Sequence, residues 1–107
     1  MSHRHHRYCS VRSVTQAQSP YSIVDPDDMV VVDATLGVVT INLPSAAAYK
    51  GRQLTVKKRD VSINLVTVAG VSGNLIDGLS SRTLPLQWDS LDVVSDGTDW
   101  LRVGAVP

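Results

Sequence analysis

The sequence of 107 residues has a single cysteine, no phenylalanine and no glutamate, and its three histidines lie at positions 3, 5 and 6. Residues 10–107 therefore contain neither histidine nor cysteine, so a Ser-His-Asp triad or a Cys-His pair cannot be assembled within them. One cysteine forms no internal disulfide, and the fold must be held together by packing of its core. We expect a protein that is not an enzyme and that needs no cofactor.

Long hydrophobic runs and an excess charge are also absent. No apolar run approaches the roughly 18 to 20 residues that span a bilayer, and the basic, polar start of the chain differs from a signal peptide. Ten Lys and Arg residues balance ten Asp residues, so the formal net charge is zero. This balance gives no general attraction to a polyanion. We expect neither a nucleic acid nor a membrane as partner.

The abundant residues are those of strands and turns. Val, Ile and Thr account for 28 of the 107 residues, and they favour strands. Nine short apolar runs from Tyr21 onward, separated by Asp, Asn, Gly and Pro, predict an all-β body. The strongest hairpin signal is the turn 96–99. The segment 44–49 has helical composition but is long enough for only a turn or two.

The chain divides by charge into two parts. Residues 1–18 carry Arg4, Arg7 and Arg12 and no acid, whereas residues 19–107 carry seven basic and ten acidic side chains. The first part has few large apolar groups and no periodicity, so it cannot offset its ordering entropy alone. We expect residues 1–18 to form a flexible basic arm and residues 19–107 to form a β-rich, trimerising body.

The strand patterns predict which residues pack together. In the run 38–43, residues 39, 41 and 43 share one apolar face. The runs 30–32 and 66–68 are apolar on both faces, which in a small antiparallel body requires cover from another copy or a larger partner. We therefore expect a small antiparallel β-sandwich or barrel-like body in a tightly packed or intertwined homotrimer. The residues assigned to core or trimer packing are Val39, Ile41, Leu43, Leu54, Val56, Trp88 and Trp100.

Several clusters of chemically active residue types have simpler structural explanations. His3, His5, His6 and Cys9 are metal-ligand types but lack an ordered scaffold at defined spacing. Asp-rich segments at 25–28 and 96–99 could offer oxygen ligands to calcium or the acid and base of a glycosidase, but they match no calcium-loop pattern, and the chain has only five aromatic residues to line a sugar-binding cleft. Turn chemistry explains them better. The basic triplet 57–59 is interpreted as a solvated strand end.

The order of short motifs resembles a β-rich module of bacteriophage virion proteins, found in tail fibres and in small capsid-decorating (cement) proteins. The motifs are Asp33-Ala34-Thr35, residues 39–46, residues 51–58, Ile76-Asp77-Gly78 and residues 95–100. The resemblance covers residues 30–104 and implies a non-enzymatic, closely packed homotrimer. None of the motif residues supplies a nucleophile, a base or a metal site, so their expected roles are structural.

This resemblance implies a location in the virion, on the capsid exterior or the tail. The expected function is that of a capsid decoration protein, which binds the assembled lattice of the major capsid protein as a trimer and stabilises it. A fibre would carry a long shaft where this chain has a short basic arm, and this difference favours decoration. Arg4, Arg7 and Arg12 would then anchor the arm on acidic capsid groups. The alternative is a tail- or head-fibre module that binds a host receptor or glycan.

Overall fold

The computed structural model describes residues 9–106 and confirms a body built mainly from β-strands. Two 3-10 helices, η2 (Gln16–Gln18) and η3 (Ala46–Tyr49), are short; η3 matches the helical turn expected at 44–49. The strands are β1 (Val11–Thr15), β2 (Tyr21–Ser22), β3 (Met29–Asp33), β4 (Val39–Asn42), β5 (Gln53–Lys58), β6 (Val66–Ala69), β7 (Ser81–Leu84), β8 (Ser90–Ser95) and β9 (Trp100–Val106).

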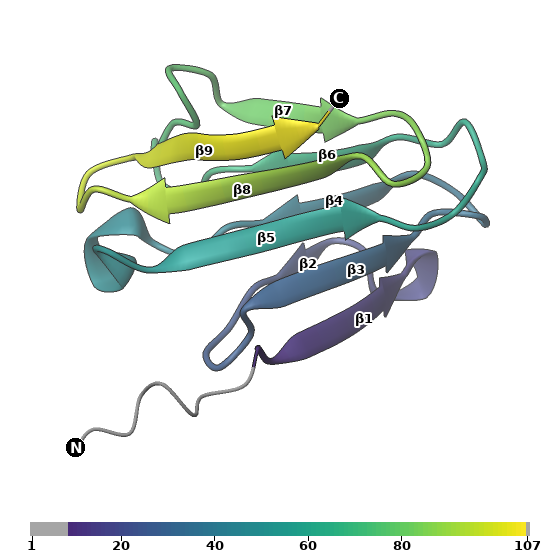
Figure 1. The fold of residues 1–107 in the computed structure, drawn as a ribbon, viewed down its shortest axis with the longest axis horizontal. Coiled ribbons are helices and arrows are strands. Elements are labelled where there is room, and N and C mark those ends of the chain that lie inside the picture. The colour runs from purple at the N-terminus through teal and green to yellow at the C-terminus, as the bar shows by residue number, and fades with distance from the viewer. Residues whose placement is uncertain (1–8, 107) are drawn as a thin grey trace.

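The strands form two stacked sheets, one in the order β1-β3-β5-β8-β9 and the other in the order β2-β4-β6-β7 (Figure 1). From β1 to β6 the chain crosses to the other sheet after every strand, so it winds in three coils that each add one strand to each sheet. Successive coils pair in parallel, as β1 with β3 with β5 and as β2 with β4 with β6. This winding is that of a short β-helix.

The expected antiparallel arrangement is therefore wrong for the pairs that the first six strands form with one another, which are all parallel. Antiparallel pairing is confined to the last part of the chain, where β7 pairs with β6, and β8 and β9 extend the first sheet. The hairpin expected at 96–99 is confirmed, because it joins β8 to β9. A strand that returns to its sheet through a complete coil runs in its original direction, whereas a hairpin reverses it.

The predicted boundary between arm and body also needs correction. Residues 11–15, expected in the flexible arm, form β1 at the edge of the five-stranded sheet and pair in parallel with β3. Val14 is 1% exposed within the core. Because Val11 and Val14 do not alternate with period two, no local pattern marks this strand. Residues 1–8 of the predicted arm lie outside the described residues.

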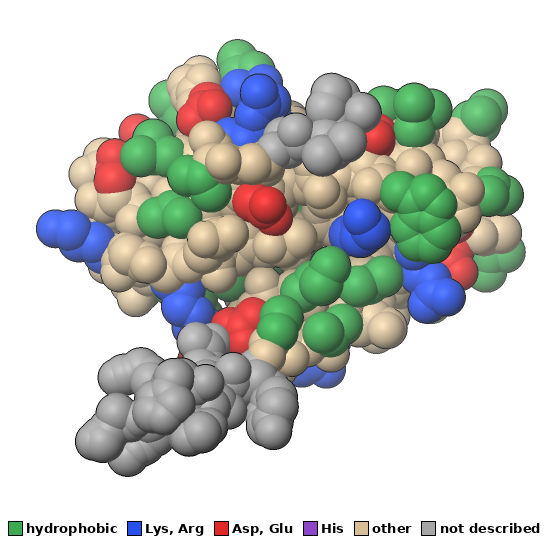
Figure 2. Space-filling model, viewed as in Figure 1, with side chains coloured by type: hydrophobic (Ala, Val, Ile, Leu, Met, Phe, Trp, Pro, Cys, Tyr) green, Lys and Arg blue, Asp and Glu red, His purple; other side chains and the backbone are tan. Residues whose placement is uncertain are grey.

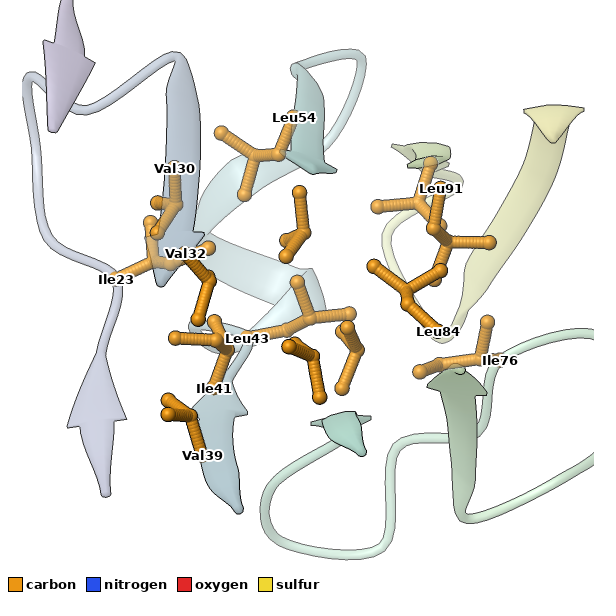
Figure 3. Packing of buried hydrophobic residues seen from close by; sticks show 14 of the residues in the cluster. Ile23, Val30, Val32, Val39, Ile41, Leu43, Leu54, Ile76, Leu84 and Leu91 are labelled. Atoms are coloured by element: carbon orange, nitrogen blue, oxygen red, sulfur yellow. The ribbon is translucent and has the colours of Figure 1, made fainter. Parts of the chain in front are cut away.

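The core fills the space between the two sheets, where apolar side chains from both sheets point toward one another (Figure 3). Six of the seven residues predicted to pack are at most 1% exposed: Val39, Ile41, Leu43, Leu54, Val56 and Trp100. These six side chains pack in the core of the single chain. Trp88 is 55% exposed, so it does not pack in the core of a single chain, and its packing between copies stays a prediction. The strand before it, β7, ends at Leu84, and the turn that follows carries Trp88 away from the core.

Three of the segments that contain the short motifs contact one another around Trp100 at one end of the sandwich. The fully buried indole of Trp100 donates a hydrogen bond from Nε1 to the carbonyl of Pro44 at 3.2 Å, and its backbone N–H donates to Leu75 at 2.8 Å. Asn74 Oδ1 accepts the Ala46 N–H at 2.9 Å. Segments 44–46, 74–77 and 95–100 thus act as one packing unit, in keeping with structural roles for these motifs.

Candidate interaction surface

The opposite end of the sandwich carries a concentration of exposed apolar side chains. Three turns meet there, at residues 34–38, 59–65 and 85–89, and they join β3 to β4, β5 to β6 and β7 to β8. This end lies at the right in Figure 1, and Figure 2 shows apolar side chains gathered along the same end. We call this set of residues the loop-end surface: Leu36 (82% exposed), Val38 (60%), Val61 (79%), Ile63 (92%), Leu65 (39%), Leu86 (63%) and Trp88 (55%).

A buried ion pair anchors two of these turns beneath the surface. Lys58 is the last residue of β5, and its Nζ lies 2.7 Å from Asp60 Oδ2. Lys58 is fully buried, so the interpretation of the triplet 57–59 as a solvated strand end is wrong at this residue, because the ion pair compensates its burial. The other oxygen of Asp60 accepts the backbone N–H of Ala34 at 2.7 Å. A buried charge needs both a counter-ion and hydrogen bonds, and Asp60 has both. The carboxylate therefore ties the turn after β5 to the turn after β3.

Two polar side chains extend this network. Asn64 Nδ2 donates to the carbonyl of Ala34 at 2.8 Å and to that of Thr35 at 3.3 Å. The hydroxyl of Ser62 lies within hydrogen-bonding distance of both the Ala34 carbonyl and the Asp60 carboxylate. These contacts satisfy backbone groups that the turns would otherwise leave without partners. The apolar side chains at 61, 63 and 65 therefore project from a braced turn.

The third turn is braced by a second buried carboxylate. Asp89 is 4% exposed, and its Oδ2 accepts the N–H of Leu86 at 2.9 Å while its own N–H donates to the Leu86 carbonyl at 3.0 Å. The N–H of Trp88 donates to the carbonyl of Lys58 at 2.7 Å. The turn that carries Leu86 and Trp88 is thereby joined to the end of β5.

Trp88 has an unusual backbone conformation for a bulky residue. Its φ is +72°, in the left-handed region, which costs a non-glycine residue roughly 1 to 2 kcal/mol. Lys57 Nζ lies 5.8 Å from the centre of its ring system and donates to the Trp88 carbonyl at 3.2 Å. An indole half exposed to solvent and held in a costly conformation is typical of residues retained for an interaction.

The loop-end surface exposes little negative charge. Burial alone would raise the pKa of Asp60, but hydrogen bonds from Lys58, Ser62 and the Ala34 amide outweigh it and hold that pKa well below its ordinary value. Hydrogen bonds from the hydroxyl and amide of Thr35 lower the pKa of Asp33. Both carboxylates thus stay ionised and engaged within the chain, while Arg59 is exposed beside them.

The structure describes one of the three predicted anchoring arginines, Arg12, and places it in the sheet. Arg12 lies in β1, with Nε 3.2 Å from Asp27 Oδ1 and its guanidinium 5.9 Å from the centre of the Tyr21 ring. Asp27 is buried and also accepts a 2.5 Å hydrogen bond from the Tyr21 hydroxyl. Arg12 is therefore paired within the body, and its role as a capsid anchor stays a prediction. Arg4 and Arg7 lie outside the described residues.

The Asp-rich turns have structural partners. Arg52 pairs with Asp25 at 2.8 Å and with Asp28 at 3.2 Å, and Asp96 accepts the backbone N–H groups of Thr98 and Asp99 at 2.8 Å each. Within residues 9–106, no group of three or more His, Cys, Asp or Glu side chains is arranged to hold a metal ion. No helix in this part of the chain is long and apolar enough to cross a membrane.

Sequence reasoning missed the loop-end surface. The available signal was the presence of large apolar residues between turn formers, as at Val61 and Ile63 after Asp60. Comparison with protein-family models and with curated proteins finds no match to this chain. The order of the short motifs is therefore the only basis for the resemblance to virion modules.

Proposed function

We propose that this chain is a structural protein of a bacteriophage virion, and specifically a capsid decoration protein that binds the assembled lattice of the major capsid protein as a homotrimer. The observation that carries the proposal is the loop-end surface, in which seven large apolar side chains project from three braced turns. An exposed apolar surface of this kind marks a protein–protein contact. The order of the structural motifs supports the virion assignment.

The proposed mechanism is stabilisation by selective binding. A trimer that contacts several capsid subunits at once binds the assembled lattice more tightly than free subunits, because each further contact is intramolecular. Binding to one state only shifts the equilibrium toward that state. The buried ion pair of Lys58 and Asp60 and the interlocked segments around Trp100 make the body a braced scaffold for this role.

A tail- or head-fibre module that binds a glycan is the second candidate, and the outer face of the four-stranded sheet favours it. Thr40 of β4, Thr67 of β6 and Thr83 of β7 are in register across neighbouring strands. Asn42 and Ser81 lie two residues away from Thr40 and Thr83 on the same face, so this face is uncharged and rich in hydroxyl and amide groups. Such groups hydrogen-bond readily to the hydroxyls of a sugar.

The test compares particles with and without the protein. Virions of the phage that encodes this chain, and of a deletion mutant, are imaged by electron microscopy and heated while DNA release is followed. We expect extra density on the capsid exterior and DNA release at a higher temperature in particles that hold the protein. Density at the tail would favour the fibre function instead, and absence of the chain from the purified virion would refute both.

A further inference from the structure

We infer that copies of this chain associate with one another through the loop-end surface, and that Trp88 is its main contact residue. The inference deepens the proposed function, because it names the surface through which the proposed homotrimer forms. Six of the seven residues first assigned to core or trimer packing are at most 1% exposed, so they are unavailable to a second copy. Trp88 is the seventh, and it lies on the loop-end surface.

The size of the surface fits an interface between copies. If a fully exposed side chain of this size class presents roughly 150 Å², the exposed fractions of the seven side chains correspond to on the order of 700 Å². The largest apolar patch on a typical monomer is roughly 300 to 600 Å². A standard interface buries about 800 Å² on each partner. The summed area of the seven side chains is therefore larger than the largest apolar patch of a typical monomer, and it is close to the area that each partner buries in a standard interface.

The composition of the surface favours a second copy over a transient partner. Transient interfaces are about as polar as the rest of a protein surface, whereas interfaces between identical subunits are more apolar and poor in charge. Two of the carboxylates beneath the loop-end surface, Asp60 and Asp89, are buried and hydrogen-bonded within the chain. The charged side chains at its rim are Arg59, which is exposed, and Lys57 and Asp33, which are partly exposed, so both signs of charge are present there. A surface of this kind can meet its own copy without strong like-charge repulsion.

The surface is also organised before binding. The contacts of Asp60 and Asn64 with Ala34, and of the Trp88 N–H with Lys58, join all three turns. Association then costs less conformational entropy than it would for mobile loops. A large, partly exposed indole is the type of side chain that dominates interface energies. Trp88 is therefore expected to contribute most to the association.

The test measures the mass of the purified full-length chain by light scattering after size exclusion. We expect the wild type to show roughly three chain masses at micromolar concentration. Trp88→Ala and, separately, Ile63→Asp should raise the concentration for half-dissociation by about 30-fold or more. Val103→Asp is the matched control, because Val103 on β9 is 58% exposed but lies away from the three turns; it should leave the mass unchanged.

A second measurement needs no variant. Trp100 is fully buried within the chain, so a change in acrylamide quenching on dilution reports on Trp88, and quenching should rise as the trimer dissociates. A wild-type monomer at about 100 µM, or loop-end variants that keep the wild-type mass, would overturn the inference. If such variants stay trimeric but no longer bind particles, the surface docks on the capsid instead. A further outcome separates the two proposals. If Trp88→Ala abolishes the trimer but purified virions lack the protein, the inference is upheld and the decoration function is refuted.

Discussion

Lys58 Nζ and Asp60 Oδ2 lie 2.7 Å apart beneath the loop-end surface, and their side chains are 0% and 4% exposed. This pair couples the stability of the fold to the shape of the surface, because Asp60 also holds the Ala34 amide of the neighbouring turn. Loss of one partner would leave the other charge buried without compensation. The conformation of the exposed apolar turns therefore depends on a polar network that is buried beneath them.

Asp60→Asn should lower the free energy of unfolding by about 3 to 5 kcal/mol, because it leaves the Lys58 ammonium buried without a counter-ion. Urea denaturation followed by circular dichroism measures this loss. Asp25→Asn is the control, since Asp25 pairs with Arg52 but its side chain is 75% exposed, and it should cost less than about 1 kcal/mol. Equal costs for the two variants would contradict the role of Asp60.

The same carboxylate should make stability depend on acidity. The pKa of Asp60 in the folded chain lies well below the value of about 3.9 expected for the unfolded chain. Its stabilising effect is therefore complete above about pH 5 and is lost as the pH falls below about 4 toward the folded pKa. The difference in unfolding free energy between wild type and Asp60→Asn should shrink over this range. A difference independent of pH between about 6 and 2 would contradict the assignment.

The two tryptophans should respond differently to the same substitution. Trp100→Phe removes the hydrogen bond to the Pro44 carbonyl and part of the core volume, and should cost about 1 to 3 kcal/mol. Trp88→Phe keeps an exposed aromatic ring at the loop-end surface and should cost less than about 0.5 kcal/mol. Thermal unfolding at a fixed, low protein concentration checks both. A larger cost at position 88 would mean that Trp88 packs within the chain.

Trp88→Gly should stabilise the isolated chain relative to Trp88→Ala by about 1 kcal/mol, because glycine adopts a φ of +72° without a steric penalty. Both variants remove the indole, so the difference between their unfolding free energies measures the backbone strain at position 88. Urea denaturation under conditions where both are monomeric provides the measurement. If the alanine variant is as stable as the glycine variant, Trp88 carries no backbone strain.

Two valines of β1 test whether residues 11–15 belong to the body. Val14→Asp buries a carboxylate in the core at a position that is 1% exposed, and should cost about 3 kcal/mol or more. Val11→Asp changes the same residue type in the same strand where it is 58% exposed, and should cost less than about 1 kcal/mol. Similar small costs for both would restore the flexible arm that the charge distribution suggested.

The β class, the turn at 44–49 and the hairpin at 96–99 could be predicted because each depends on neighbours in sequence. Alternation places Val39 and Ile41 on one face of a strand, and the aspartates and glycine of 96–99 favour a reversal. The buried position of Trp100 follows from the strand after that turn. These features are local, so the order of residues determines them before any long-range contact forms.

Pairing partners and exposure were decided by the tertiary structure. Whether a strand pairs in parallel depends on the path of the chain between sheets, which turn residues do not encode. Arg12 was assigned to a free arm because Asp27, its partner, is 15 residues away. The loop-end surface needs the turns at 34–38, 59–65 and 85–89 to converge. Composition determined that the chain would form strands, but only the winding of those strands into coils brought these turns together and left Trp88 in solvent.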